Sequence, residues 1–376
     1  MTLLTGASFG SAPKRTALKN KIEQSLRFLF KQYGYNEIAL PVYEYYSVLK
    51  NTGHRFPDEH LISFTDISSG RLLVLRPDFT PQVSRLVAGY KDAFPLPIRL
   101  SYGGPVFRNA DIQHGAKAEK YHLGCELYGA PEKDGDKELL LLAVSAARAA
   151  LADCMLIIGD AAYLARLRSL LGDYAAEYFD ILKGKKLYKN TEFVSKLSGD
   201  RSVNPLLLPL IAELPAIFGG IQVLKRLKEL SAFDSKLLKR ADYLTTLFSE
   251  GEELGIAGDA LLFDAAEILD LNYYTGLTLE LFHRESGVAL GSGGRYDSLM
   301  NTFNLTLNAC GLSLYLEELA DVSPLEDERL GVDYLVLGDI HKAEELRKSG
   351  HTVALVHSKE EIDAFLLFSD AKNVIN

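Results

Sequence analysis

The spacing of apolar residues predicts a helix near the start of the chain, followed by strands. Four apolar positions recur at helical spacing within residues 14–34, namely Ile22, Leu26, Leu29 and Phe30. Gly34 is expected to end this helix. Strands are predicted at 37–41 and at 71–77, with a connection between them.

A second helix and two longer strands are predicted from the next segment. Thr80 is a suitable N-cap and Pro81 a suitable first helical residue, so a helix should begin there. Residues 98–107 and 121–129 read as strands, joined by a polar loop. A long helix with one apolar face is expected over about 136–152.

The remaining pattern predicts an α+β fold with two parts. Residues from about 165 to 260 lack alternation and should be a mostly helical insertion, after which strands resume at 273–296. A helix is expected through LSLYLEELA at 312–320. Strands joined by loops and hairpins favour an antiparallel sheet. We therefore expect one large unit over 1–325 and a short α/β appendage over 326–376, which reads strand–helix–strand.

Composition narrows the classes of partner. The chain has 376 residues, 47% of them hydrophobic, which is enough for a sizeable core. Its 41 basic and 50 acidic side chains give a formal charge of −9, which argues against a strong nucleic-acid-binding face. The three cysteines show no metal-binding spacing, and no signal segment or membrane span is visible. We expect a soluble, cytoplasmic protein without a metal or a cofactor.

Strand 121–129 carries the first candidate chemistry. One face would present His122, Gly124, Glu126 and Tyr128, while Leu123, Cys125 and Leu127 would face the core. A glycine inside a strand often marks close approach by a ligand or by another backbone. An ordinary half-exposed sheet with a polar outer face explains the same pattern.

Other polar residues are equally open to two interpretations. Asp78 could hold a ligand ammonium or serve the N-terminus of the following helix. Arg108 could clamp a carboxylate or form a surface salt bridge. Phenols lie close to glycines at Tyr273 and Tyr274 and again at Tyr296 within GGRYD. This combination could bind a small polar ring, and a hairpin turn explains the glycines equally well.

Taken in order, six segments resemble a known family. They are EIALPVYE, LRPDFTPQ, PVFRN, YHLGCELYG, LNYYTGLTLE and GGRYDSL. Together they are similar to the catalytic core of histidyl-tRNA synthetase, a class II aminoacyl-tRNA synthetase, over about residues 10–320. The resemblance implies an antiparallel catalytic-type sheet. It also implies a homodimer whose interface includes the first helix and the strand ending at Pro41.

The departures from that family fall on its ATP side. By resemblance, the family's arginines and a glutamate are replaced by Leu269, Ala110, Ala116, Ala118 and Glu318, and Asp270 stands at the glycine position next to Leu269. Phosphoryl and adenylyl chemistry depends on positioning and charge neutralisation. Glu318 should place a negative charge toward polyphosphate and disfavour ATP. We expect no catalytic residues and no aminoacylation.

The amino-acid side of the family's site is better retained. By resemblance, Asp78 and Thr80 would bind the ligand ammonium, and Arg108 its carboxylate. Glu126, Tyr274 and Tyr296 would bind the imidazole nitrogens, in a pocket that also includes Tyr273. His122 stands where the family usually has glutamine, which leaves the geometry of that contact open.

This combination resembles the regulatory paralogues of the synthetase that assemble with the short-form catalytic subunit of ATP phosphoribosyltransferase. Residues after 330 are also too few for the synthetase's anticodon-binding domain. The resemblance implies a homodimer within a hetero-oligomer, expected to be an octamer or larger, with L-histidine as the effector. It implies no membrane or tRNA partner. A divergent active synthetase and another amino-acid- or tRNA-sensing module are the alternatives.

Overall fold

A computed structural model gives the architecture of the chain. The structure describes residues 13–51, 57–90, 93–109, 118–268, 273–324 and 330–375. Within these ranges, no helix is both long enough and apolar enough to cross a bilayer.

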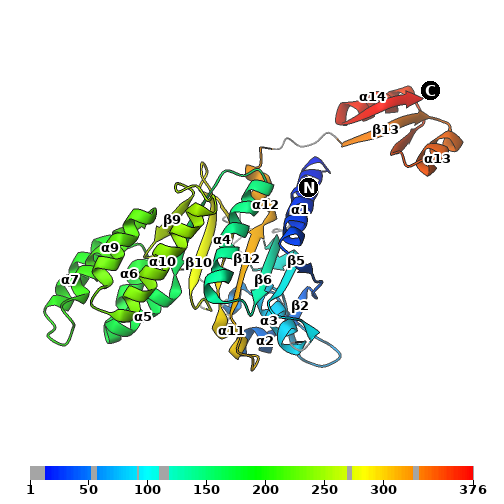
Figure 1. Cartoon of the computed structure of the whole chain (residues 1–376). Coiled ribbons are helices and arrows are strands. Elements are labelled where there is room, and N and C mark those ends of the chain that lie inside the picture. Colours follow the sequence, from blue (N-terminus) through cyan, green and yellow to red (C-terminus); the bar gives the residue numbers. More distant parts are fainter. Residues whose placement is uncertain are drawn as a thin grey trace.

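The large unit is organised around a nine-stranded sheet in the order β1-β5-β6-β12-β11-β10-β7-β9-β8 (Figure 1). Its strands are β1 (Asn36–Glu37), β5 (Ile98–Phe107), β6 (Glu119–Tyr128), β7 (Cys154–Asp160), β8 (Phe218–Gly219), β9 (Leu261–Asp264), β10 (Leu277–His283), β11 (Ala289–Arg295) and β12 (Ala309–Tyr315). Pairing is antiparallel from β5 through β7, and parallel only where β1 meets β5 and β7 meets β9. The predicted α+β class is confirmed.

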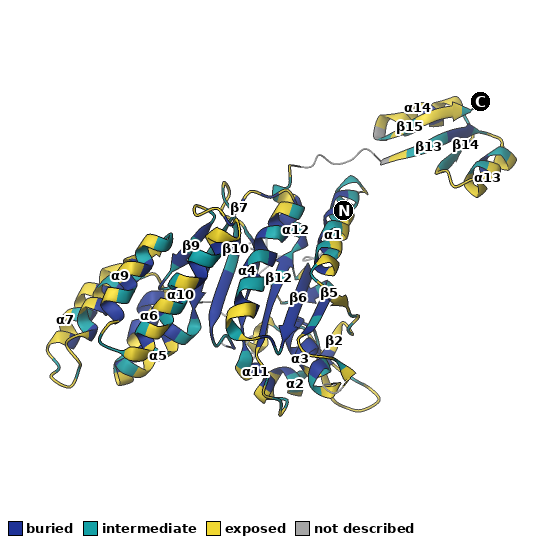
Figure 2. Cartoon of the chain, viewed as in Figure 1, coloured by how far each residue is buried: buried dark blue, intermediate teal, exposed yellow. Residues whose placement is uncertain are grey.

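One face of this sheet is covered by two long helices and a short one. They are α1 (Pro13–Gln32), α4 (Glu132–Ala149) and α12 (Leu316–Val322). The predicted apolar stripe of α1, with Ile22 and Leu26 at its centre, belongs to the main core together with Leu123 and Leu127 of β6. Figure 2 shows the central strands as the most deeply buried part of the molecule.

The opposite face carries the second hydrophobic core and the site. Its helices are α2 (Tyr46–Asn51), α3 (Thr80–Gly89) and α11 (Asp297–Asn301), and β2 (Tyr43–Tyr45), β4 (Leu72–Leu75) and β3 (Ser63–Thr65) form a separate antiparallel sheet in that order. Val83 and Val87 of α3 pack in one cluster with Leu100 and Tyr102 of β5. The start of α3 is thereby held over the middle of the sheet.

Between β7 and β9 the chain forms a helical unit. It comprises α5 (Ala161–Leu171), α6 (Ala175–Lys183), α7 (Asn190–Ser198), α8 (Leu207–Glu213), α9 (Ile221–Ser231) and α10 (Ser235–Glu253). Figure 1 shows these helices grouped beyond the β10–β7–β9 end of the sheet. The unit is therefore attached to the large sheet at both of its ends.

The tail forms its own small parallel sheet in the order β14-β13-β15. Its elements are β13 (Leu330–Leu337), α13 (Ile340–Lys348), β14 (Val353–Val356), α14 (Lys359–Phe368) and β15 (Ser369–Ile375). The predicted strand–helix–strand accounts for the first three, and α14 and β15 were not predicted. The proposed division after residue 325 falls outside the described residues and stays a prediction.

Two element predictions were wrong. The strand expected at 37–41 ends at Glu37, because the carbonyls of Leu40 and Pro41 accept hydrogen bonds from the Arg76 guanidinium instead of from a neighbouring strand. The helix expected at 312–320 is a strand up to Tyr315 and a helix only from there on. In β12 the core residues Cys310, Leu312 and Leu314 alternate with Gly311, Ser313 and Tyr315, as in a strand, and the chain then runs directly into α12.

Candidate functional site

One cavity of about 570 Å³ opens on the face of the sheet that α3 covers. It is lined by residues of β5, β6, β10, β11, β12 and α3 and of the loops beside them. All eight predicted site residues are among those that line it: Asp78, Thr80, Arg108, His122, Glu126, Tyr273, Tyr274 and Tyr296. The structure brings these residues together, and their binding of histidine stays a prediction.

Glu126 is the polar centre of this cavity. Its side chain is only 1% exposed, and its Oε1 accepts hydrogen bonds from Thr80 Oγ1 at 2.8 Å and from the Tyr102 hydroxyl at 3.3 Å. The Tyr296 hydroxyl donates to Oε2. Burial raises the pKa of the Glu126 carboxyl from 4.5 to about 8, although the hydroxyls of Tyr296 and Thr80 oppose that rise. Glu126 is thus a buried acid whose described donors are all neutral hydroxyls.

Two glycines make room for this centre. A Cβ atom at Gly311 would overlap Glu126 Oε2. A Cβ at Gly124 would overlap the Tyr102 hydroxyl. Gly124 is therefore required by the approach of a protein side chain rather than by that of a ligand alone.

A second carboxylate, Asp78, faces the same cavity. Its Oδ2 accepts a hydrogen bond from the Tyr273 hydroxyl at 3.4 Å, and its Oδ1 accepts one from the backbone N–H of Phe79 at 2.7 Å. The Tyr273 ring lies 4.8 Å from that of Tyr274 and 5.7 Å from that of Tyr296. Asp78 thus contacts the helix start and the tyrosine wall at once. Two carboxylates within an aromatic enclosure suit a cationic or N–H-donating ligand.

His122 is a buried neutral imidazole. Its Nδ1 lies 3.0 Å from Ser313 Oγ, and its ring lies 4.9 Å from that of Tyr315. Burial, followed by the charge of Arg108, lowers the pKa of His122 to about 3. Arg108 donates from Nε to the carbonyl of Pro77 at 3.1 Å. The His122 side chain is thus uncharged at neutral pH.

Of the six residues expected to disfavour ATP, the structure describes only Ala118 and Glu318. Leu269, Asp270, Ala110 and Ala116 lie outside the described residues. The Ala118 carbonyl accepts a hydrogen bond from the Arg108 backbone N–H at 2.8 Å.

Glu318 does not line the cavity, and its carboxylate accepts a hydrogen bond from Lys120 Nζ at 2.7 Å. Glu318 thus forms an ion pair with Lys120. The expectation that Glu318 disfavours ATP stays a prediction.

The expected role of Thr80 as an N-cap was also wrong. Helix α3 starts at Thr80 itself, Phe79 occupies the N-cap position, and no described side chain caps the helix. The Thr80 hydroxyl donates to Glu126 instead. A residue type that usually satisfies a helix end is used here to satisfy a buried carboxylate.

Several residues that line the cavity were not predicted, among them Tyr102, Tyr315, Ser313, Lys183 and Glu280. In the sheet, Tyr102 lies opposite Gly124 and Tyr315 opposite His122. That register places both phenols beside residues that were predicted. The glycine opposite Tyr102 was the available sequence signal. Lys183 comes from the end of α6, so the helical unit also reaches the cavity.

Comparisons with known proteins agree with this architecture. The family model described as "Histidyl-tRNA synthetase" matches residues 10–319. The chain is 32% identical over 311 residues to the ATP phosphoribosyltransferase regulatory subunit of a Thermoanaerobacter species, covering 81% of this chain and 78% of the relative. The chain belongs to the histidyl-tRNA synthetase family, in its branch of ATP phosphoribosyltransferase regulatory subunits. The resemblance inferred from the six sequence segments is thereby confirmed.

Further members of the family support the same placement. The regulatory subunit of Caldanaerobacter subterraneus is 30% identical, over 82% of this chain and 79% of the relative. A Bacillus halodurans structure described as an ATP phosphoribosyltransferase regulatory subunit/histidyl-tRNA synthetase superposes with a TM-score of 0.83 at 25% identity, covering 100% of this chain and 99% of that one. Histidyl-tRNA synthetase from a Nostoc species, at 19% identity and a TM-score of 0.77 over 98% and 89% of the two chains, shows the fold alone.

Proposed function

We propose that this chain is a non-catalytic regulatory subunit of short-form ATP phosphoribosyltransferase in histidine biosynthesis. In this role it is required for the activity of the catalytic subunit and makes that activity sensitive to histidine. The names of its curated relatives support the regulatory role. The composition of the cavity supports histidine as the effector.

The observation that carries the choice of ligand is the set of bonds around Glu126. Binding of an N–H donor would favour the ionised form of the Glu126 carboxyl, and an ionised carboxylate offers about four acceptor positions. Hydroxyls of Thr80, Tyr102 and Tyr296 occupy three of them among the described residues. About one position is left for a donor from a ligand, and an imidazole N–H fits it. An analogue without that N–H leaves a buried acceptor unpaired, which makes the site selective.

The rest of the proposed pose follows from the charges around this centre. The ligand ammonium lies near Asp78, and the ligand carboxylate faces Arg108, both of which line the cavity. The rings of Tyr273, Tyr274 and Tyr296 enclose the imidazole. His122, held by Ser313, contributes a neutral polar group beside the ligand.

Regulation requires that histidine prefer one state of the assembled complex. A ligand shifts an equilibrium only by the difference between its affinities for the two states. By linkage, the state of the catalytic partner must then alter histidine affinity by the same factor. The proposal therefore predicts different histidine affinities for the isolated chain and for the complex.

The direct test is titration calorimetry of L-histidine into the wild-type chain and into Glu126→Gln and Tyr274→Phe variants. We expect Glu126→Gln to weaken binding about 10- to 100-fold, because an acceptor for the ring N–H becomes an amide with a competing donor. Glu213→Gln is the control, because Glu213 lies on the helical unit and pairs with Arg226 at 2.6 Å. Equal affinity in all four proteins would place the regulatory histidine elsewhere.

Assembly is tested by co-expression with a short-form catalytic subunit. We expect a hetero-oligomer of octameric or larger size, containing dimers of this chain, with histidine-sensitive phosphoribosyltransferase activity. The Glu126→Gln variant should assemble and activate normally while its inhibition by histidine weakens. Absence of both complex and activation would exclude the regulatory role.

The alternative of an active synthetase is tested separately. Histidine-dependent exchange of pyrophosphate into ATP requires a functioning adenylate site, and we expect none. Robust exchange would overturn the non-catalytic assignment.

A further inference from the structure

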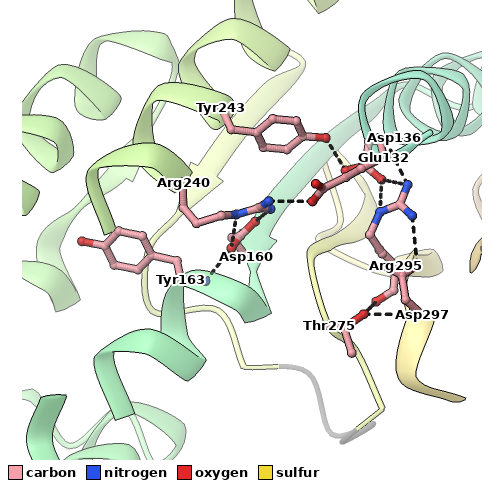
Figure 3. Close-up of polar contacts among 9 residues, drawn as sticks. All are labelled: Glu132, Asp136, Asp160, Tyr163, Arg240, Tyr243, Thr275, Arg295 and Asp297. Atoms are coloured by element: carbon pink, nitrogen blue, oxygen red, sulfur yellow. Dashed lines mark hydrogen bonds and ion pairs between the residues drawn. The ribbon is translucent and has the colours of Figure 1, made fainter. Parts of the chain in front are cut away.

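A buried ionic cluster lies behind the wall of the cavity and has no part in the proposed ligand contacts (Figure 3). At its centre is Arg295, which is only 1% exposed. Its Nε donates to Asp136 Oδ1 at 2.9 Å and its Nη1 to Asp297 Oδ1 at 3.0 Å. Its Nη2 also donates to the carbonyl of Glu132 at 3.0 Å. The guanidinium is therefore held on three sides.

The same cluster reaches into the helical unit through α10. The Tyr243 hydroxyl donates to Asp136 Oδ2 at 2.5 Å. Arg240 Nη1 donates to Glu132 Oε1 at 2.6 Å, and its guanidinium also pairs with Asp160. Asp160 caps the start of α5 by accepting from the Tyr163 N–H at 2.6 Å. Figure 3 shows one line of contacts from the last helix of the unit to α4 and to the turn after β11.

On its other side the cluster fixes the tyrosines of the cavity. Arg295 directly precedes Tyr296, and its carbonyl accepts from the Thr275 N–H at 2.7 Å. The Asp297 N–H donates to Thr275 Oγ1 at 2.9 Å. Because Thr275 follows Tyr274, both tyrosines are joined to the Arg295 backbone within one residue.

There is little space for Arg295 to move without moving these tyrosines. A Cβ at Gly276 would lie 2.9 Å from Arg295 Cδ, and one at Gly135 would lie 3.0 Å from Arg295 Nη2. A shift of α4 or α10 is therefore passed to the turn that carries Tyr296 rather than absorbed by a gap. Lys183 of α6, which lines the cavity, gives the helical unit a second contact with the site.

We infer that Arg295 is a positioning residue of the cavity, and that Tyr243 and Arg240 couple occupancy of the cavity to the attachment of the helical unit. The identity of the ligand rests on the proposed function, whereas the coupling rests on these contacts alone. The helical unit thus becomes the element through which a bound histidine is sensed outside the cavity. Reciprocity requires that a change in the attachment of α10 alter ligand affinity.

The test uses Tyr243→Phe, which removes one hydroxyl outside the cavity and leaves Arg295 in place. The matched control is Tyr174→Phe, which removes a tyrosine–carboxylate bond of 2.7 Å to Asp200 within the helical unit. L-Histidine affinity is measured by calorimetry, and amide hydrogen exchange is followed at 273–276, 293–297 and in α10. We expect Tyr243→Phe to weaken histidine binding about three- to tenfold and the control to leave it unchanged.

Hydrogen exchange separates coupling from a merely structural role. In the wild type, saturating L-histidine should slow exchange within α10, and this protection should disappear in Tyr243→Phe but persist in Tyr174→Phe. Even without ligand, Tyr243→Phe should speed exchange at 293–297. If the wild type binds no histidine while ligand-free Tyr243→Phe still exchanges faster at 293–297, the proposed ligand is refuted and the coupling stands. Unchanged exchange at 293–297 in Tyr243→Phe would overturn the coupling.

Discussion

Two buried carboxylates on opposite sides of β11 are satisfied in different ways. Asp136 is paired with the Arg295 guanidinium and bonded by Tyr243, and burial raises its pKa only to about 6. Glu126 is bonded by three hydroxyls and has no cation bound to it among the described residues, and burial raises its pKa to about 8. A buried carboxylate that is paired with a cation stabilises the fold. One that is bonded only by neutral donors can still be stabilised further by a cationic or N–H-donating ligand.

Removing the cation from the first of these sites should have the largest effect. Arg295→Met leaves Asp136 buried without its partner, so the free energy of unfolding should fall by about 3–5 kcal/mol. Urea unfolding monitored by circular dichroism measures this loss. Arg226→Met, which breaks an exposed pair with Glu213, is the control and should cause no measurable change. Equal stability of the two variants would show that Asp136 does not depend on its ion pair with Arg295.

The second test is the pH dependence that Glu126 contributes. Its pKa is about 8 in the folded chain, against an ordinary value of 4.5 for a glutamate in an unfolded chain. Between these values the folded chain holds a proton that the unfolded chain has lost. This contribution to stability is full below about pH 4.5 and is lost as the pH rises through about 8. The urea midpoint of the wild type should therefore fall across that window relative to Glu126→Gln. Parallel curves would show that Glu126 is ionised throughout.

Gly311→Ala tests the space around the Glu126 carboxylate. The new methyl group would overlap Oε2 and force the side chain away from Tyr296. We expect a loss of about 1–3 kcal/mol in unfolding free energy, together with weaker histidine binding. Gly70→Ala is a control for backbone effects, because Gly70 has a φ of +67° but no described atom within 4 Å of the place that a Cβ would take. Full affinity in Gly311→Ala would show that the bonds to Glu126 are dispensable.

The smallest expected effect comes from single hydroxyls. Thr80→Val removes one donor to Glu126 and should cost about 1 kcal/mol. Thr278→Val removes a buried hydroxyl for which no described atom is a partner, so it should be neutral or stabilising. Thermal unfolding of the two variants gives the comparison, and the same sign for both would contradict it.

The sequence predicted the site residues better than it predicted the bonds among them. Glu126, Asp78 and Tyr296 were identified because their segments resemble a known family, and each lines the cavity. Tyr102 and Tyr315 were missed because their positions depend on strand register, which pairs them with Gly124 and His122. The ion pair of Arg295 with Asp136 spans 159 residues, a separation at which no local pattern predicts contact.

The same limits explain the errors in the fold. Thr80 looked like an N-cap because short hydroxyl residues usually bond the helix backbone, and tertiary packing redirected its hydroxyl to Glu126. The strand at 309–315 was assigned to a helix although its core residues alternate along the sequence, because it continues without a break into α12. The spacing of apolar residues was sufficient to predict α1, because this helix buries only one face.

The hydrogen bond between Tyr273 and Asp78 joins residues 195 positions apart, and β6 pairs with β12 across the whole helical unit. During synthesis, therefore, the cavity cannot close until β12 has left the ribosome. The helical unit, built from local contacts, can fold earlier. A chain interrupted before residue 309 would keep β6 paired with β5 but leave its other edge open, and an open edge of a buried strand is prone to aggregation. Ligand-binding competence thus reports that nearly the whole chain has been translated.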